Sequence, residues 1–175
     1  HQDPFFEKYR HNSKWLETAE FLLSQPVESA IGVELFNKPP NTKNETPPHQ
    51  DNYYFCFEPP HVLTIWVALD QSDELNGCMR YVSGSHVHGL RPHKRSSILG
   101  FSQSISNFGV SDLENEEVIS AKPGDALVHH GNTIHRAEPN RTCDRHRRGF
   151  AMVIKGTQAK RNIDKYKSYC ESSMI

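Results

Sequence analysis

Short segments rich in β-branched and aromatic residues, separated by turn signals, constrain the fold of this chain more than any other feature. Segment 62–70 shows the pattern best, because its aliphatic side chains alternate with Thr64, Trp66 and Ala68. Many short strands with few helices favour a β-sandwich or barrel, which can bring residues from distant strands to one interior point. We expect strands at "IGVELF" (31–36), "YYFCF" (53–57), "VLTIWVALD" (62–70), "CMRYV" (78–82), "ALVHH" (126–130), "TIH" (133–135) and "RRGFAMVIK" (147–155).

Turn residues and flanking segments complete the expected organisation. Asn76-Gly77 predicts a hairpin between segments 62–70 and 78–82, and Pro123-Gly124 predicts a type II turn. The remaining expectations are an amphipathic helix over 13–24 with Ser13 as its N-cap, a proline-rich loop over 37–48 that suits neither a helix nor a central strand, a long polar loop over 83–116 and a short helix or tail over 159–175.

Length and composition limit the domain count and the classes of partner. The 175 residues suit one domain over 1–175 with its core at about 31–155, and His1 in place of Met leaves open an upstream segment. The 20 Lys and Arg balance the 21 Asp and Glu, so neither nucleic acid nor an anionic membrane is an expected partner. No apolar run reaches the roughly 18 residues of a membrane span. Nothing in the sequence indicates the oligomeric state.

The cysteines bear on the compartment. All four lie far apart and form no CxxC pair, which argues against a zinc ribbon and against a dense disulfide framework. A reducing compartment such as the cytoplasm is therefore expected.

Histidine is abundant, with 11 residues, and metal ligation is one reason for its use. The triplet His-Gln-Asp occurs twice, but the copy at 1–3 lies at a chain end, where little structure could hold a ligand. In the copy at 49–51, an extended backbone would project His49 and Asp51 from one face and Gln50 from the other. One histidine and one carboxylate make up two thirds of the facial triad that binds non-haem Fe(II).

The missing histidine must come from another segment. His135 in "GNTIHRAEPN" is one candidate, and His129 and His130 compete for the role from the middle of an apolar strand, where at least one of them should simply pack. Zinc accepts the same ligand types. The residues alone therefore also allow a cupin-like metal-binding protein or a metal-dependent hydrolase.

Four segments follow one another along the chain: "TPPHQDNYYF", "IWVALDQSDELNGCMRYVSGSH", "KPGDALVHHGNTIHRAEPN" and "RHRRGF". Together they resemble the phytanoyl-CoA dioxygenase family of Fe(II)- and 2-oxoglutarate-dependent oxygenases. The resemblance implies a double-stranded β-helix, a mainly β jelly roll of the cupin type, with a flanking N-terminal helix. It also implies that the chain uses Fe(II), 2-oxoglutarate and O2 to hydroxylate a C–H bond of a small organic substrate, releasing succinate and CO2.

The same resemblance assigns roles to individual residues. His49, Asp51 and His135 would bind the iron. An arginine shortly after the second histidine would bind the remote carboxylate of 2-oxoglutarate in a bidentate manner. Arg145, Arg147 and Arg148 compete for this role, and the match of "RRGF" favours Arg147.

Further positions concern the co-substrate pocket and the outcome of the reaction. Trp66 matches a family tryptophan that lines the pocket. Ala137 stands where the family often has a small hydroxyl residue, so Thr64 or Asn37 would have to supply the missing hydrogen bond. Asp51 favours hydroxylation over halogenation, because related halogenases have a small residue there.

The sequence says less about the substrate. Arg80, Arg136 and the basic segment 91–95 favour one with negative charge. Residues expected as candidates for the substrate pocket are Tyr53, Tyr54, Phe57, Arg80, Phe101 and Arg136.

Overall fold

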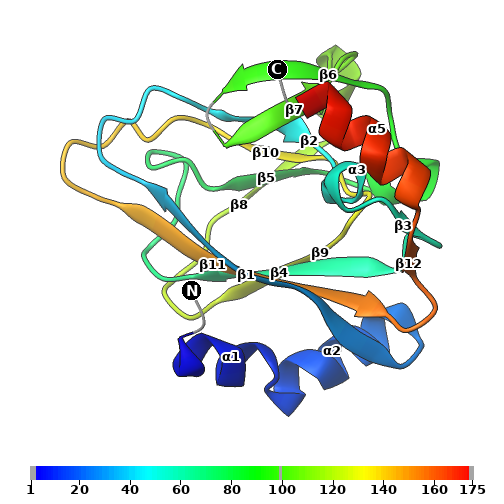
Figure 1. Ribbon diagram of the computed structural model, residues 1–175. Coiled ribbons are helices and arrows are strands. Elements are labelled where there is room, and N and C mark those ends of the chain that lie inside the picture. The colour runs from blue at the N-terminus through cyan, green and yellow to red at the C-terminus, as the bar shows by residue number, and fades with distance from the viewer. Residues whose placement is uncertain (1–2, 99, 174–175) are drawn as a thin grey trace.

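Two four-stranded antiparallel sheets face each other in the computed structural model, which describes residues 3–98 and 100–173, without the side chains of Ala30 and Ile31 (Figure 1). This arrangement is the expected double-stranded β-helix. The first sheet has the order β1 (Val27–Lys38), β11 (Arg147–Gly156), β4 (Val62–Ala68) and β9 (Ala126–His130). The second has the order β2 (Thr46–His49), β10 (His135–Ala137), β5 (Met79–Val82) and β8 (Glu116–Ile119).

Helices α1 (Pro4–Arg10) and α2 (Ser13–Leu23) lie against the outer face of the first sheet (Figure 1). The α2 helix confirms the expected amphipathic helix, although its N-cap is Asn12, whose side chain accepts from Lys14 N, rather than Ser13. No helix was expected at the position of α1. Both faces of β4 are covered, which is why the whole strand is buried. The outer-face core is formed by Trp15, Ala19, Leu63, Ile65, Val67, Phe150, Met152 and Ile154.

The remaining elements lie mostly around the second sheet. The hairpin of β6 (His93–Ile98) and β7 (Phe101–Ile105) and the helix α5 (Ile163–Ser173) are on the side of the molecule away from α1 and α2 (Figure 1). Short pieces of structure occupy the polar stretch 83–116, as expected, and α5 confirms the C-terminal helix. The other short elements are α3 (Asp51–Phe55), β3 (Phe57–Glu58), η1 (Ser85–His88), α4 (Val110–Glu114) and β12 (Lys160–Arg161). None of the helices in the described part of the chain has the length and apolar character that crossing a membrane requires.

The strand expected at 53–57 is wrong, because most of this segment forms the single-turn helix α3. The aromatic composition suggested a strand, but contacts with distant residues hold the helix. Asn52 is buried, and its backbone N–H donates to Gly131 O at 2.8 Å. Its side chain also closes the turn that follows, accepting from Phe57 N at 3.0 Å and donating to Phe57 O at 3.1 Å. Tertiary hydrogen bonds thus override the local preference.

The hairpin predicted at Asn76-Gly77 is also wrong, because β4 and β5 belong to different sheets. The Asn76 side chain is fully buried and bonds within the segment that connects β4 to β5. It accepts from Asp73 N at 2.8 Å and donates to Gln71 O at 2.7 Å. Gly77 has a positive φ of 79°, and a Cβ atom there would overlap the carbonyl of Glu138. Asn-Gly therefore makes a tight crossover between sheets. The turn at Pro123-Gly124 is confirmed, with Asp125 N donating to Lys122 O.

The proline-rich segment 37–48 is only partly a loop. β1 extends to Lys38, and β2 begins at Thr46 and contains Pro47 and Pro48. Proline cannot donate a ladder hydrogen bond, so it is tolerated only at the edge of a sheet. β2 is such an edge strand, paired with β10 alone. The expectation that no central strand forms here is thereby confirmed.

Close packing within the first sheet, between β11 and β4, gives a test of this fold. A Cβ atom at Gly149 would overlap the indole of Trp66, which is only 3% exposed. We expect Gly149→Ala to lower the free energy of unfolding by about 1–3 kcal/mol, measured by urea denaturation, because a packed core resists extra volume. Gly32→Ala is the matched control, since its Cβ meets no atom within 4 Å. Equal stability of the two variants would contradict this packing.

Candidate active site

A cavity of about 660 Å³ lies between the two sheets and beneath the β6–β7 hairpin. Its wall combines side chains from both sheets, from α3 and from α5. The residues with ionisable or imidazole side chains in this wall are Glu34, Lys38, His49, Asp51, Tyr54, His129, His135, Arg147 and Tyr169.

Strand register places the two predicted histidine ligands side by side. His135 in β10 is the direct partner of His49 in β2, and their ring centroids are 4.2 Å apart. Asp51 follows two residues later as the first residue of α3. Gln50 points away from both, as expected, because its side chain donates to Gly89 O and Asn132 O and accepts from Arg91 N. These bonds fix the backbone between the imidazole and the carboxylate.

The ligand atoms of His49, Asp51 and His135 all lie within 4.8 Å of one another. Each Nε2 is 3.5 Å from Asp51 Oδ1. The other ring nitrogens contact backbone carbonyls, with His49 Nδ1 2.7 Å from Pro47 O and His135 Nδ1 3.0 Å from Thr133 O. A carbonyl can only accept, so in each neutral ring Nδ1 carries the proton and Nε2 presents a lone pair to the centre.

The second oxygen of Asp51 is held from the opposite sheet. Thr64 Oγ donates to Asp51 Oδ2 at 2.6 Å, and His129 Nε2 lies 3.0 Å from the same oxygen. Tyr81 Oη is 3.3 Å from His129 Nδ1, which suits a hydroxyl that donates to the ring. His129 therefore contacts the cluster through the carboxylate. His130 is engaged elsewhere, with its Nδ1 accepting from Asn132 N at 3.1 Å.

The electrostatics of the cluster favour a bound cation. Burial raises the pKa of Asp51, but the surrounding imidazoles of His135, His129 and His49 outweigh it and hold that pKa well below its usual range. Burial, followed by the neighbouring His49, holds the pKa of His135 well below its ordinary value, so this ring is neutral. The neutral His135 ring and the ionised Asp51 carboxylate thus lie in one cluster with His49 Nε2. Such a donor set fits a divalent metal ion.

Arg147 is the arginine of the three competitors that reaches the cavity. Arg145 pairs with Asp73 at 2.6 Å and Arg148 pairs with Asp70 at 2.7 Å. Arg147 is 4% exposed and lies over the Trp66 ring at 5.6 Å, and no acceptor for its Nε is found among the described residues. Burial lowers its pKa to about 10, so the guanidinium stays charged at neutral pH. A buried cation without a counter-charge favours an anionic ligand.

Lys38 is a second cation in the cavity wall that the sequence did not single out. It is the register partner of Arg147 across β1 and β11. Its Nζ donates to Ala137 O at 3.3 Å and to Glu138 O at 2.6 Å. Burial, and then the charge of Arg147, lowers its pKa to about 7. Lys38 comes beside Arg147 only because β1 pairs with β11, and the residues around Lys38 in the sequence do not indicate this pairing.

The other residues expected around the co-substrate also line the cavity. Trp66, Thr64 and Asn37 are all part of its wall. The hydroxyl of Thr64 is bonded to Asp51, and Asn37 Oδ1 lies 3.0 Å from His146 Nδ1. Ala137 is buried in the core between the sheets. A hydrogen bond from Thr64 or Asn37 to the co-substrate therefore stays a prediction.

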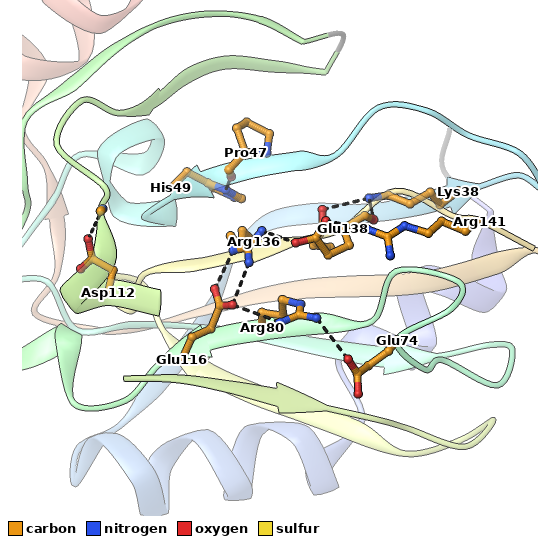
Figure 2. A network of polar contacts seen from close by, with 12 residues as sticks. Lys38, Pro47, His49, Glu74, Arg80, Asp112, Glu116, Arg136, Glu138 and Arg141 are labelled. Carbon is orange, nitrogen blue, oxygen red and sulfur yellow. Dashed lines mark hydrogen bonds and ion pairs between the residues drawn. The ribbon is translucent and has the colours of Figure 1, made fainter. Parts of the chain in front are cut away.

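Among the residues expected around a substrate, Tyr54 and Phe101 line this cavity, whereas Tyr53 and Phe57 line a separate pocket beside α5. Arg80 and Arg136 lie outside the wall in an ion-pair network (Figure 2). Arg136 Nε is 2.6 Å from Glu116 Oε1, and Arg80 Nη1 is 3.3 Å from Glu116 Oε2. The charges of both arginines are thus compensated by carboxylates. Arg80 and Arg136 therefore do not favour an anionic substrate.

The first His-Gln-Asp triplet has no part in this site. His1 and Gln2 lie outside the described residues. Asp3 caps α1 by accepting from Phe5 N at 2.8 Å.

Comparisons with known proteins agree with this geometry. A phytanoyl-CoA dioxygenase of Arabidopsis thaliana is 29% identical over 140 residues, which cover 79% of this chain and 48% of that protein. The peroxisomal phytanoyl-CoA dioxygenase of Homo sapiens is 30% identical over 136 residues, covering 74% and 38% respectively. The chain thus spans about half or less of the length of these two curated relatives.

A solved structure shares the architecture. EvdO2 from Micromonospora carbonacea var. aurantiaca, complexed with 2-oxoglutarate, matches with a TM-score of 0.71 and 26% identity over 91% of this chain and 62% of that chain. Residues 1–149 match the family described as phytanoyl-CoA dioxygenase (PhyH). The chain therefore belongs to the phytanoyl-CoA dioxygenase family.

Proposed function

We propose that this chain is the oxygenase domain of an Fe(II)- and 2-oxoglutarate-dependent dioxygenase that hydroxylates a C–H bond of a small organic substrate. One observation carries the proposal. The cluster of His49, Asp51 and His135, whose ligand atoms lie within 4.8 Å of one another, shares a cavity with the unpaired guanidinium of Arg147. A ligand that chelates a metal at one end and presents a carboxylate at the other would satisfy both features. The dianion 2-oxoglutarate has this form.

In this proposal His49, Asp51 and His135 would hold Fe(II). When bound, iron with 2-oxoglutarate and O2 supplies the oxidising chemistry, with succinate and CO2 as co-products. Arg147 binds and orients the remote carboxylate of 2-oxoglutarate. The guanidinium itself lies over the Trp66 ring, in a cation–π contact that helps to position it. The buried apolar wall keeps water from competing for these contacts.

The protein groups around Asp51 orient one of its oxygens. Thr64 and His129 bond Oδ2, so Oδ1 is the atom left to face the two histidines. Hydrogen bonds that orient a metal-bound carboxylate in this way strengthen metal binding. Asp51 also keeps the coordination position that halogenases leave to chloride, which favours hydroxylation.

A metal-dependent hydrolase would use the same three ligands, since zinc accepts two histidines and one carboxylate. It has no need of a buried, uncompensated arginine close to the metal. Arg147 and the family membership both favour the oxygenase.

We also propose a small-molecule substrate and a reducing compartment, such as the cytoplasm. The cavity volume suits a small organic ligand. All four cysteines are free, which fits a reducing environment. The human relative carries a peroxisomal description, so localisation of the tagged full-length protein by microscopy would test the compartment.

Succinate formation tests the proposed activity directly. Purified protein with Fe(II), ascorbate and 2-oxoglutarate should form succinate even without substrate, at a slow uncoupled rate. Asp51→Ala should abolish this turnover, because it removes the anionic ligand, whereas Asp144→Ala removes an exposed carboxylate and should retain it. Normal succinate formation by both Asp51→Ala and His135→Ala would refute the assignment.

Metal affinity tests the orientation of Asp51. Thr64→Val keeps the shape of the side chain and removes the hydroxyl that donates to Oδ2. We expect it to weaken Mn(II) binding by about tenfold, measured by calorimetry, since such outer contacts typically contribute that much. Thr46→Val is the matched control, because Thr46 lines the same cavity without contacting Asp51. An unchanged affinity in Thr64→Val would show that Asp51 needs no such support.

A further inference from the structure

The carboxylate of Glu34 is the one acidic group of the cavity wall that belongs neither to the metal cluster nor to an ion pair among the described residues. Glu34 lies in β1, where alternate residues share a face. Phe36 on that face packs against the core between the sheets, and Lys38 lines the cavity. The neighbouring Val33 packs on the opposite side, against the helices. Strand periodicity therefore directs Glu34 toward the cavity.

The surroundings of Glu34 contain no partner for its charge. No hydrogen bond or ion pair to its side chain is found within residues 3–98 and 100–173. Burial raises the pKa of Glu34, and the negative charge of Asp51 raises it further. Glu34 is nevertheless exposed to solvent, and it lines the cavity. A ligand bound in the cavity would therefore displace water from the Glu34 carboxylate.

Arg147 and Lys38 have other partners: the proposed co-substrate for Arg147, and the carbonyls of Ala137 and Glu138 for Lys38. Arg147 faces the position proposed for the remote carboxylate, and Lys38 is its register partner. Glu34 is four residues before Lys38 in an extended strand, so their Cα atoms lie about 13 Å apart along the strand. The cations therefore leave Glu34 uncompensated when 2-oxoglutarate is bound.

Much of the remaining cavity wall is apolar or carries hydroxyl groups. Phe55, Ile98, Phe101 and Val153 supply apolar surface, and Ser96, Ser97 and Ser102 come from the β6–β7 hairpin. Phe101 packs against the His49 ring, with centroids 5.0 Å apart. A substrate held here would lie beside the metal cluster, in contact with apolar groups and with one carboxylate.

We propose that Glu34 is a specificity-determining residue that binds a protonated amine of the substrate, which makes the substrate a cationic organic amine. The inference rests on the proposed function and names the substrate class of that same site. An ammonium group would form a charge-assisted hydrogen bond with the carboxylate inside a partly desolvated cavity. A negatively charged substrate would meet repulsion from Glu34.

A matched set of probes tests the inference. 3-Phenylpropylamine, 3-phenylpropanol and 3-phenylpropionate share one apolar body and differ in the charge of the terminal group. Their binding to protein loaded with Mn(II) and 2-oxoglutarate is measured by calorimetry under anaerobic conditions. This readout does not depend on turnover, so a failure of the oxygenase proposal would be seen separately, as absent succinate formation by the Fe(II)-loaded wild type.

We expect the amine to bind the wild type at least about tenfold more tightly than the carboxylate. Glu34→Gln keeps the shape and removes the charge, and should weaken amine binding by about tenfold while leaving the alcohol within about twofold. Glu34→Lys should reverse the preference between amine and carboxylate. Glu20→Gln, which removes an exposed carboxylate from α2, should leave all three affinities unchanged.

Three results would overturn the inference. The first is a wild type that binds the carboxylate as tightly as the amine, or does not bind the amine at millimolar concentration. The second is an amine affinity that is the same in Glu34→Gln as in the wild type. The third is an equal loss in Glu20→Gln, which would assign the effect to net charge rather than to this cavity.

Discussion

The hydrogen bonds to Asp51 Oδ2 are the constraint on which the site depends. Thr64 and His129 approach this oxygen from the first sheet, while His49 and His135 face Oδ1 from the second. The carboxylate is therefore held at the point where the two sheets meet. The bonds to Oδ2 fix which oxygen of Asp51 faces the two histidines. With these bonds in place, one oxygen and two ring nitrogens are left to share a cation.

The fold supplies this arrangement through strand register rather than through local sequence. His49 and His135 are direct partners in the β2–β10 ladder, and Thr64 and His129 are direct partners in the β4–β9 ladder. Two pairs of residues, one from each sheet, thus meet across the cavity. Lys38 and Arg147 are likewise a register pair. A slip of one residue in any of these ladders would turn side chains to the opposite face and destroy the site.

The sequence predicted the features that local pattern encodes. The strand over 62–70 could be predicted, because burial on both faces leaves a strong hydrophobic pattern. The clustering of His49, Asp51 and His135 could be predicted because the motifs are short and ordered. The errors arose where long-range contacts decide the conformation. In segment 53–57 the helix is held by Asn52 N, which donates to Gly131 O. Gly77 packs against the Glu138 carbonyl, in a crossover between sheets instead of a hairpin. The positions of Lys38, His129 and Glu34 could not be predicted, because each depends on which strands become neighbours.

The most direct test of the central claim is the visible spectrum of the protein under anaerobic conditions. If the three side chains hold Fe(II) and Arg147 holds 2-oxoglutarate, adding both should produce a metal-to-ligand charge-transfer band that neither produces alone. The band should be absent in Asp51→Ala, and it should need a higher concentration of 2-oxoglutarate in Arg147→Met. A folded wild-type protein that shows no band with saturating Fe(II) and 2-oxoglutarate would contradict the account.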